Sequence, residues 1–316
     1  MALSAHSSSN QKLESAVMAE EALKVLDSSL SQIKWRLKPS SKRRLQIDVL
    51  ALCSAMRPVI MVDYGGKMPE LQDQLCALLE LIQKESTIFQ QLRVMIIEDM
   101  IYLVNVEEFA GYISWSLSAD GKQFFVDLEQ DPPKMISTGD ESPASKELVS
   151  VQGFFSSVFT SEGVNCDALK GHGKDNSENT ESSSVEHSQF FEVVDLSSCI
   201  QDSKITIPTL NGWLLGYPVV YLFDRDHIPD AIYNLSTKPL HLFRVLVRRN
   251  SSQSNSLPLE ELTSFSVPYD LSMDGRNEPW AEAFWVEVQA KWERCKQVWR
   301  SMQMEVNECY PQAIAL

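Results

Sequence analysis

The sequence predicts an α/β protein, α+β-like, with a mixed parallel and antiparallel sheet flanked by helices and with long amphipathic helices at both ends. Near both termini, apolar residues recur at intervals of three and four. Short continuous apolar runs lie between helical patterns, as in strands that are buried on both faces. With 316 residues, of which 44% are hydrophobic, the chain can bury a sizeable core, which excludes a wholly disordered or fibrous protein.

Two helical patterns precede the first strand. Alanines, leucines and Ile33 on one face predict an amphipathic helix over 16–37, and a second helix is predicted over 42–56. The apolar run 59–62, a helix that begins at Pro69, and the apolar run 94–97 then predict a strand, a helix and a strand, with the two strands parallel.

The next segment is predicted to be antiparallel. A hairpin with arms at 111–117 and 122–128 is expected to turn at Asp120-Gly121, a pair of residues that tight turns favour. The predicted sheet is therefore mixed.

A serine-rich, acidic segment interrupts this pattern. Residues 130–189 are predicted to be a largely disordered insertion, because their composition offers little apolar surface to bury. Residues 1–129 and 190–316 are then expected to form one α/β domain. Within the insertion, the three phenylalanines of VQGFFSSVF (151–159) are expected to dock on that domain.

Beyond the insertion, the sequence predicts strands and one last helix. The strand candidates are 190–194, 214–223, 240–247 and 263–267. A long helix is predicted from Pro279 to Cys309, with three tryptophans on one face, which is typical of core packing. Because both terminal helices are too apolar to face water, they are expected to pack on each other.

Charge and composition restrict the partners. The formal net charge is -15, which disfavours nucleic-acid binding, but KWRLKPSSKRR (34–44) holds six bases and no acid. An unidentified protein partner is expected to bind through this basic segment or through the insertion. No apolar run is long enough to cross a membrane and the start has no signal-peptide pattern, so a cytoplasmic or nuclear location is expected. The six cysteines are expected to be reduced and to lack metal-ligand spacing.

The sequence contains few residue patterns that indicate a chemical activity. The leading interpretation is a protein of unknown function that acts as a non-catalytic interaction module, without a cofactor. The alternative is a metal-dependent hydrolase or phosphoryl-transfer enzyme. It rests on acids that follow strands, Asp63, Asp99 and Asp224, because ligands tend to bind at the carboxyl ends of parallel strands. In that alternative Asp63 and Asp99 hold Mg²⁺, with Asp224 as a further metal candidate, and Lys67 binds a phosphate. Neither His227 nor His241 has a companion at metal-ligand spacing.

One segment carries a family resemblance. The run LNGWLLGYPVVY, from Leu210 to Tyr221, together with the tryptophan-rich C-terminal region and the chain length, resembles an uncharacterised animal family of the chromosome one open reading frame seventy-four type, a domain of unknown function. The resemblance implies no activity, cofactor or catalytic residue.

Overall fold

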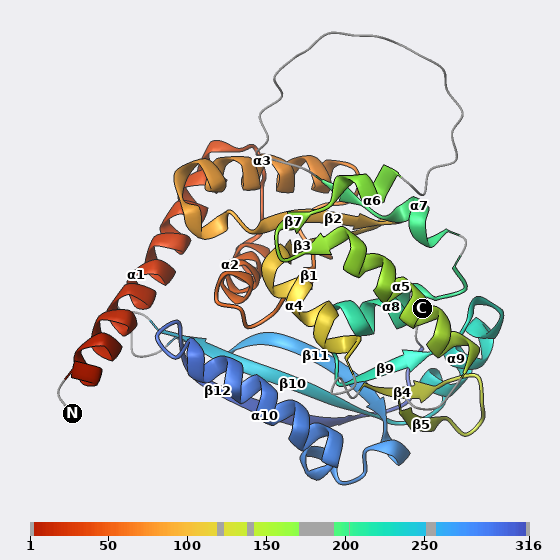
Figure 1. The fold of residues 1–316 in the computed structure, drawn as a ribbon. Coiled ribbons are helices and arrows are strands. Elements are labelled where there is room, and N and C mark those ends of the chain that lie inside the picture. Colours follow the sequence, from red (N-terminus) through yellow and green to blue (C-terminus); the bar gives the residue numbers. More distant parts are fainter. Residues whose placement is uncertain are drawn as a thin grey trace, which may run out of the picture.

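The computed structural model describes residues 3–118, 123–137, 142–170, 193–201, 203–250 and 257–313. It is a mixed α/β protein, as predicted, in which helices flank three main sheets. Figure 1 shows the strands β1 to β3 in the upper half, the strands β10 to β12 in the lower half, and the helices α4, α5 and α8 between them.

The first sheet has the strand order β1-β3-β2-β8. Its strands are β1 (Val59–Met61), β2 (Leu92–Ile97), β3 (Met100–Asn105) and β8 (Val194–Asp195). Both β1 and β2 run antiparallel to β3, so they point the same way, as predicted, but β3 lies between them. The short strand β8 adds to β2 in parallel.

Three helices cover one side of this sheet. They are α1 (Leu3–Gln32), α2 (Pro39–Cys53) and α3 (Glu70–Glu85). The helix α1 packs mainly against α2 and α3 (Figure 1) rather than forming the expected pair with the last helix. It ends five residues earlier than predicted, because the chain turns there and carries Trp35 into the core, where its Nε1 donates a hydrogen bond to the Gly65 carbonyl at 2.8 Å.

The second sheet has the order β5-β4-β9, and its strands are β4 (Phe124–Asp127), β5 (Lys134–Ser137) and β9 (Val219–Leu222). The predicted hairpin is wrong, because its first arm belongs to the helix α4 (Val106–Ser116). The side chain of Asn105 caps that helix by accepting the Glu108 backbone N–H at 3.2 Å, which a strand would not provide. The expected turn at 120–121 lies outside the described residues.

The insertion is ordered over much of its length, contrary to the expectation. Residues 143–158 form the helix α5 (Pro143–Val158), which Ser142 and Ser145 cap reciprocally. Phe155 is fully buried and meets Trp213 edge to face, with ring centroids 5.4 Å apart, so the phenylalanine segment does dock. The segment folds in spite of its polar composition because a few large aromatic residues bury enough surface to order a helix. Residues 171–189 of the insertion lie outside the described part.

The third sheet has the order β11-β10-β12, and its strands are β10 (Leu240–Arg249), β11 (Glu260–Pro268) and β12 (Trp299–Cys309). The predicted last helix is half wrong: α10 (Pro279–Arg294) ends early, and the remaining residues form β12, antiparallel to β10. A strand is favoured there because Met302, Met304 and Val306 are buried or half-buried while Gln303 and Asn307 are exposed, which is closer to a period of two than to helical spacing.

The remaining elements are short. They are the helices α6 (Cys166–Lys170), α7 (Ser197–Ile200), α8 (Ile207–Leu214) and α9 (Ile228–Ser236), the 3₁₀ helices η1 (Thr87–Phe89), η2 (Arg225–His227), η3 (Tyr269–Leu271) and η4 (Gly275–Asn277), and the strands β6 (Phe159–Thr160) and β7 (Gly163–Val164). The expected strand 214–223 is therefore the end of α8, a turn, and β9. Gly212 belongs to α8, where a Cβ would lie 3.0 Å from Val220 Cγ1, so glycine lets the helix approach β9 closely.

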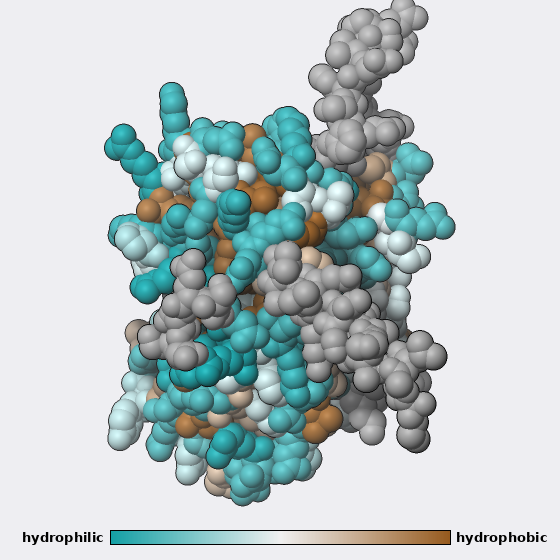
Figure 2. All heavy atoms as spheres, turned by 90° about the vertical axis from the view of Figure 1, so that its left-hand side faces the viewer, coloured by the Kyte–Doolittle hydropathy of each residue, from teal (hydrophilic) through white to brown (hydrophobic). Residues whose placement is uncertain are grey.

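The core joins both ends of the chain. Leu26 of α1 and Trp299 of β12 belong to one buried apolar cluster. The face shown in Figure 2 is mostly hydrophilic, with scattered apolar patches between polar side chains. Among the described helices, none combines the length and the apolar character that crossing a bilayer requires.

Candidate functional site

The acids that the sequence singled out fall into two places. Asp63 follows β1, and Asp99 lies in the tight turn between β2 and β3. Because β3 separates β1 from β2, a whole strand lies between the two positions, and none of the hydrogen bonds or ion pairs among the described residues joins them. The turn does reach the loop of Asp224, since Arg225 Nη2 lies 3.3 Å from Oε1 of Glu98.

The glycines before Lys67 serve packing. Gly65 has a φ of +87°, and a Cβ on it would lie 2.7 Å from Leu37 Cδ2 and 2.9 Å from Trp35 Cζ2. Only glycine fits this turn against the indole. Lys67 is exposed beyond it, so its role as a phosphate ligand stays a prediction.

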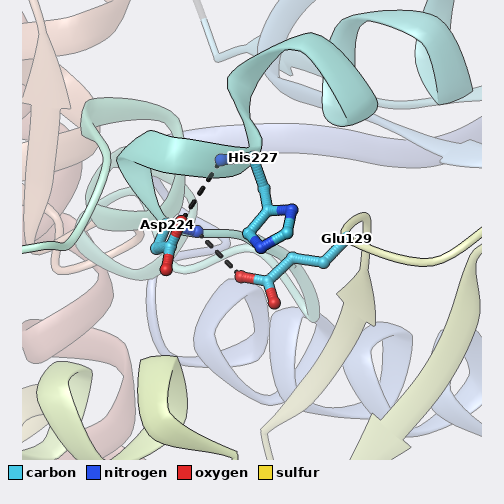
Figure 3. A group of neighbouring side chains, drawn as sticks. All are labelled: Glu129, Asp224 and His227. Carbon is cyan, nitrogen blue, oxygen red and sulfur yellow. Dashed lines mark hydrogen bonds between the residues drawn. The ribbon is translucent and has the colours of Figure 1, made fainter.

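Asp224 lies in a three-residue cluster with Glu129 and His227. Each residue offers one ligand atom, and these atoms all lie within 4.8 Å of one another. Figure 3 shows the three side chains converging from two loops, with Glu129 on one side and Asp224 and His227 on the other. The strands β4 and β9 are parallel neighbours, and Glu129 and Asp224 each follow the carboxyl end of one of them. The cluster therefore occupies the place where parallel sheets bind ligands.

Backbone hydrogen bonds hold the two carboxylates in place. The Asp224 backbone N–H donates to Glu129 Oε1 at 3.0 Å, and Oδ1 of Asp224 accepts the backbone N–H groups of Asp226 and His227 at 2.9 and 3.2 Å. Within the described part of the chain, Oε2 of Glu129 and Oδ2 of Asp224 accept no hydrogen bond. In each carboxylate, one oxygen accepts backbone hydrogen bonds that orient the group, and the second oxygen can coordinate a metal ion.

Asn234 of α9 fixes the loop that carries Glu129. Its side chain is buried, and Nδ2 donates to the carbonyls of Leu128 and Gln130 at 3.0 and 2.9 Å. These two carbonyls flank Glu129 on both sides. Because α9 follows His227 directly, one helix positions the ligands from both loops.

A second carboxylate orients the imidazole. Nδ1 of His227 lies 2.9 Å from Oδ2 of Asp230, which leaves Nε2 as the other ring nitrogen for coordination. This hydrogen bond is the main reason that the pKa of His227 is raised, and Glu129 and Asp224 act in the same direction. A carboxylate on the far nitrogen is the usual support for a histidine that binds a metal ion. The His227 side chain is 41% exposed, so the cluster is open to solvent on one side.

The donor set has a defined chemical preference. Two carboxylates and an imidazole suit Zn²⁺, Mn²⁺ or Fe²⁺ better than Mg²⁺, which prefers oxygen ligands. Sequence reasoning found Asp224 but missed Glu129 and His227, although Asp224-Arg-Asp-His227 after an apolar strand was a signal that was present. Glu129 gave no such signal, because its neighbour in space is 95 residues away in the chain.

Comparison with known proteins places the chain in a family. Residues 27–316 match the family model of a domain of unknown function, DUF4504. No curated protein and no solved structure matches the chain. Since the match covers nearly the whole chain, from the second half of α1 to the C-terminus, this protein belongs to the DUF4504 family.

Proposed function

We propose that this protein binds a divalent transition-metal ion, Zn²⁺ or Mn²⁺, through Glu129, Asp224 and His227, and that the ion serves a hydrolytic or phosphoryl-transfer reaction. The observation that carries the proposal is the convergence of these three ligand atoms at the carboxyl ends of neighbouring parallel strands. The imidazole, which Asp230 orients, favours these ions over Mg²⁺.

The geometry favours a catalytic use over a structural one. Structural zinc sites fill four positions with protein ligands, whereas catalytic sites use three and keep a position for water or substrate. Here three ligands converge at a surface that is partly open. A bound divalent ion lowers the pKa of its water ligand and polarises an ester or phosphate oxygen.

Calorimetric titration of the full chain with Zn²⁺, Mn²⁺ and Mg²⁺ tests the binding. We expect one ion per chain, with Mg²⁺ the weakest, and loss of binding in Glu129→Gln, Asp224→Asn and His227→Ala. Asp226→Asn is the matched control, because Asp226 is exposed, lies between two of the ligands and contributes only its backbone N–H. Equal affinity in Asp224→Asn and Asp226→Asn would overturn the proposed site.

Turnover requires a separate assay. Hydrolysis of p-nitrophenyl phosphate and p-nitrophenyl acetate is measured with and without the ion that binds best. We expect activity that depends on the ion and disappears in Asp224→Asn. Metal binding without turnover of either ester would contradict the catalytic part and leave the metal site in place.

The basic segment supports a second candidate function, the binding of an acidic protein partner. Two of its bases are engaged: Lys42 lies 3.0 Å from Asp27, and Arg44 lies 3.0 Å from Asp48. Lys34, Arg36, Lys38 and Arg43 are exposed. This exposed subset is what an anionic surface would contact, and salt-sensitive binding of an acidic protein would identify it.

Two finer assignments accompany these proposals. The segment from Leu210 to Tyr221 supports membership of the chromosome one open reading frame seventy-four type within the DUF4504 family. A cytoplasmic or nuclear location fits a chain with six free cysteines, and imaging of the tagged full-length protein tests it.

A further inference from the structure

The long strand β12 has one open edge. It spans 11 residues and pairs with β10 along its length, and among the described residues it has no second neighbouring strand. The Trp299 carbonyl at its start accepts a hydrogen bond from Trp292 Nε1 at 2.9 Å, and along residues 301–309 no side chain of the described part donates to a backbone carbonyl. Such an edge is a template for another strand.

The opposite edge of the same sheet is closed. Three side chains donate hydrogen bonds to backbone carbonyls of β11. Arg44 Nη1 donates to Glu261 at 2.7 Å, and Arg57 Nη1 donates to Leu262 at 3.0 Å. The Tyr221 hydroxyl donates to Ser266 at 2.8 Å. The molecule thus covers one edge of the sheet with its own side chains, whereas the described residues place no strand against the other edge.

An apolar groove lies beside the open edge. It has a volume of about 540 Å³. Its lining comes from η4, α10 and β12, and includes Arg276, Glu282, Trp285, Val286, Met302 and Met304. Val286 is 63% exposed, which is unusual for a valine on a helix that covers a sheet. A strand added at β12 would place alternate side chains in this groove.

We propose that the strand added at β12 is β12 of a second copy of this chain, antiparallel, about a two-fold axis at Met304. The sequence of β12 is self-complementary in this register. Met302 faces Val306 of the second copy, so an apolar residue meets an apolar residue there. Gln303 faces Glu305 of the second copy, so an amide meets an acid there.

The neighbouring register is worse. A two-fold axis at Glu305 would place two carboxylates face to face, and like charges directly opposite destabilise a strand pair. In the register at Met304, the two sheets join into one of six strands, with both α10 helices on the same face and Val286 beside the junction. An isologous contact of this kind closes on itself and stops at a dimer.

Sedimentation equilibrium of the full chain tests the proposal. We expect a dimer, and we expect Gln303→Glu to weaken it at least tenfold relative to Gln303→Lys, because each substitution acts twice, against Glu305 of the other copy. Gln303 Nε2 also contacts Glu305 of its own chain at 2.9 Å. The melting temperature of each variant, measured at a concentration where it is monomeric, therefore separates a folding defect from a contact defect. Val286→Glu is expected to weaken the dimer as well.

Three outcomes would overturn the inference. A wild-type chain that stays monomeric at its highest soluble concentration excludes a second copy as the occupant. A dimer that neither Gln303 variant nor Val286→Glu affects uses another surface. Equal weakening by Gln303→Lys and Gln303→Glu would put Gln303 opposite itself and contradict the register at Met304.

Discussion

Replacing Phe155 with alanine tests whether α5 is an integral part of the fold. The Phe155 side chain is fully buried. Its ring lies edge to face with Phe109 at 6.1 Å and with Trp213 at 5.4 Å. Truncation of a buried phenylalanine costs about 3 to 5 kcal/mol, and two aromatic contacts of about 0.5 to 1.5 kcal/mol each place Phe155→Ala in the upper part of that range.

Urea denaturation, followed by circular dichroism, measures this loss. The matched control is Val149→Ala on the same helix, because Val149 is 49% exposed and its truncation should change the free energy of unfolding by about 0.5 kcal/mol or less. The expected result is a lower midpoint for Phe155→Ala with an unchanged slope. A loss below about 1 kcal/mol for Phe155→Ala would refute the buried position, since no fully buried phenylalanine is so dispensable.

Three further predictions follow from charge and burial. The pKa of His227 is raised above 6.5, so protons compete with the metal ion up to a higher pH than they would at a free imidazole. The Mn²⁺ affinity measured by calorimetry should therefore still rise with pH above 6.5. An affinity that reaches its plateau below pH 6.5 would contradict the role of Asp230. Asp230→Asn should weaken metal binding by about 10- to 100-fold, less than loss of a ligand, and an unchanged affinity would show that the imidazole needs no support. Burial raises the pKa of Cys53 to about 12, so iodoacetamide labelling with mass spectrometry should leave it unmodified in the native protein and modified in urea; rapid native labelling would argue against that environment.

Local patterns predicted the N-terminal half of the fold well. The apolar run at Val59, the start of the next helix near Pro69 and the second apolar run at Val94 all correspond to elements of the structure. Each of these elements is specified by residues that are adjacent in the chain. The strands are marked by continuous apolar runs, and the helix is marked by a proline at its start. The insertion of β3 between β1 and β2 depends on pairing across the sheet, which such patterns do not encode.

The C-terminal strand β12 was predicted as a helix because the spacing of its apolar residues fits both a helix and a strand. From Trp299 onward, large apolar residues satisfy spacings of three and four, yet Met302, Met304 and Val306 also alternate with polar residues. Helical spacing was assumed to continue from α10, whereas packing against that helix selected the strand.

One of the three candidate ligands, Asp224, was predicted from the sequence. Asp224 was found because the rule about strand ends holds wherever parallel strands are neighbours, as β4 and β9 are. The same rule paired Asp63 with Asp99, whose strands are not neighbours. His227 had a local signal in Asp224-Arg-Asp-His227, whereas Glu129 could be recognised only once the long-range pairing of β4 with β9 was known.

The pairing of β4 with β9 also determines when the site can form during synthesis. Glu129 leaves the ribosome 95 residues before Asp224, and α5 and α8 must fold between the two strands. A nascent chain that stops before Asp224 lacks two of the three ligand side chains, and a complete chain lacks the site until this long loop has closed. An ion held there would therefore act late, stabilising only chains that have already brought both halves of the sequence together.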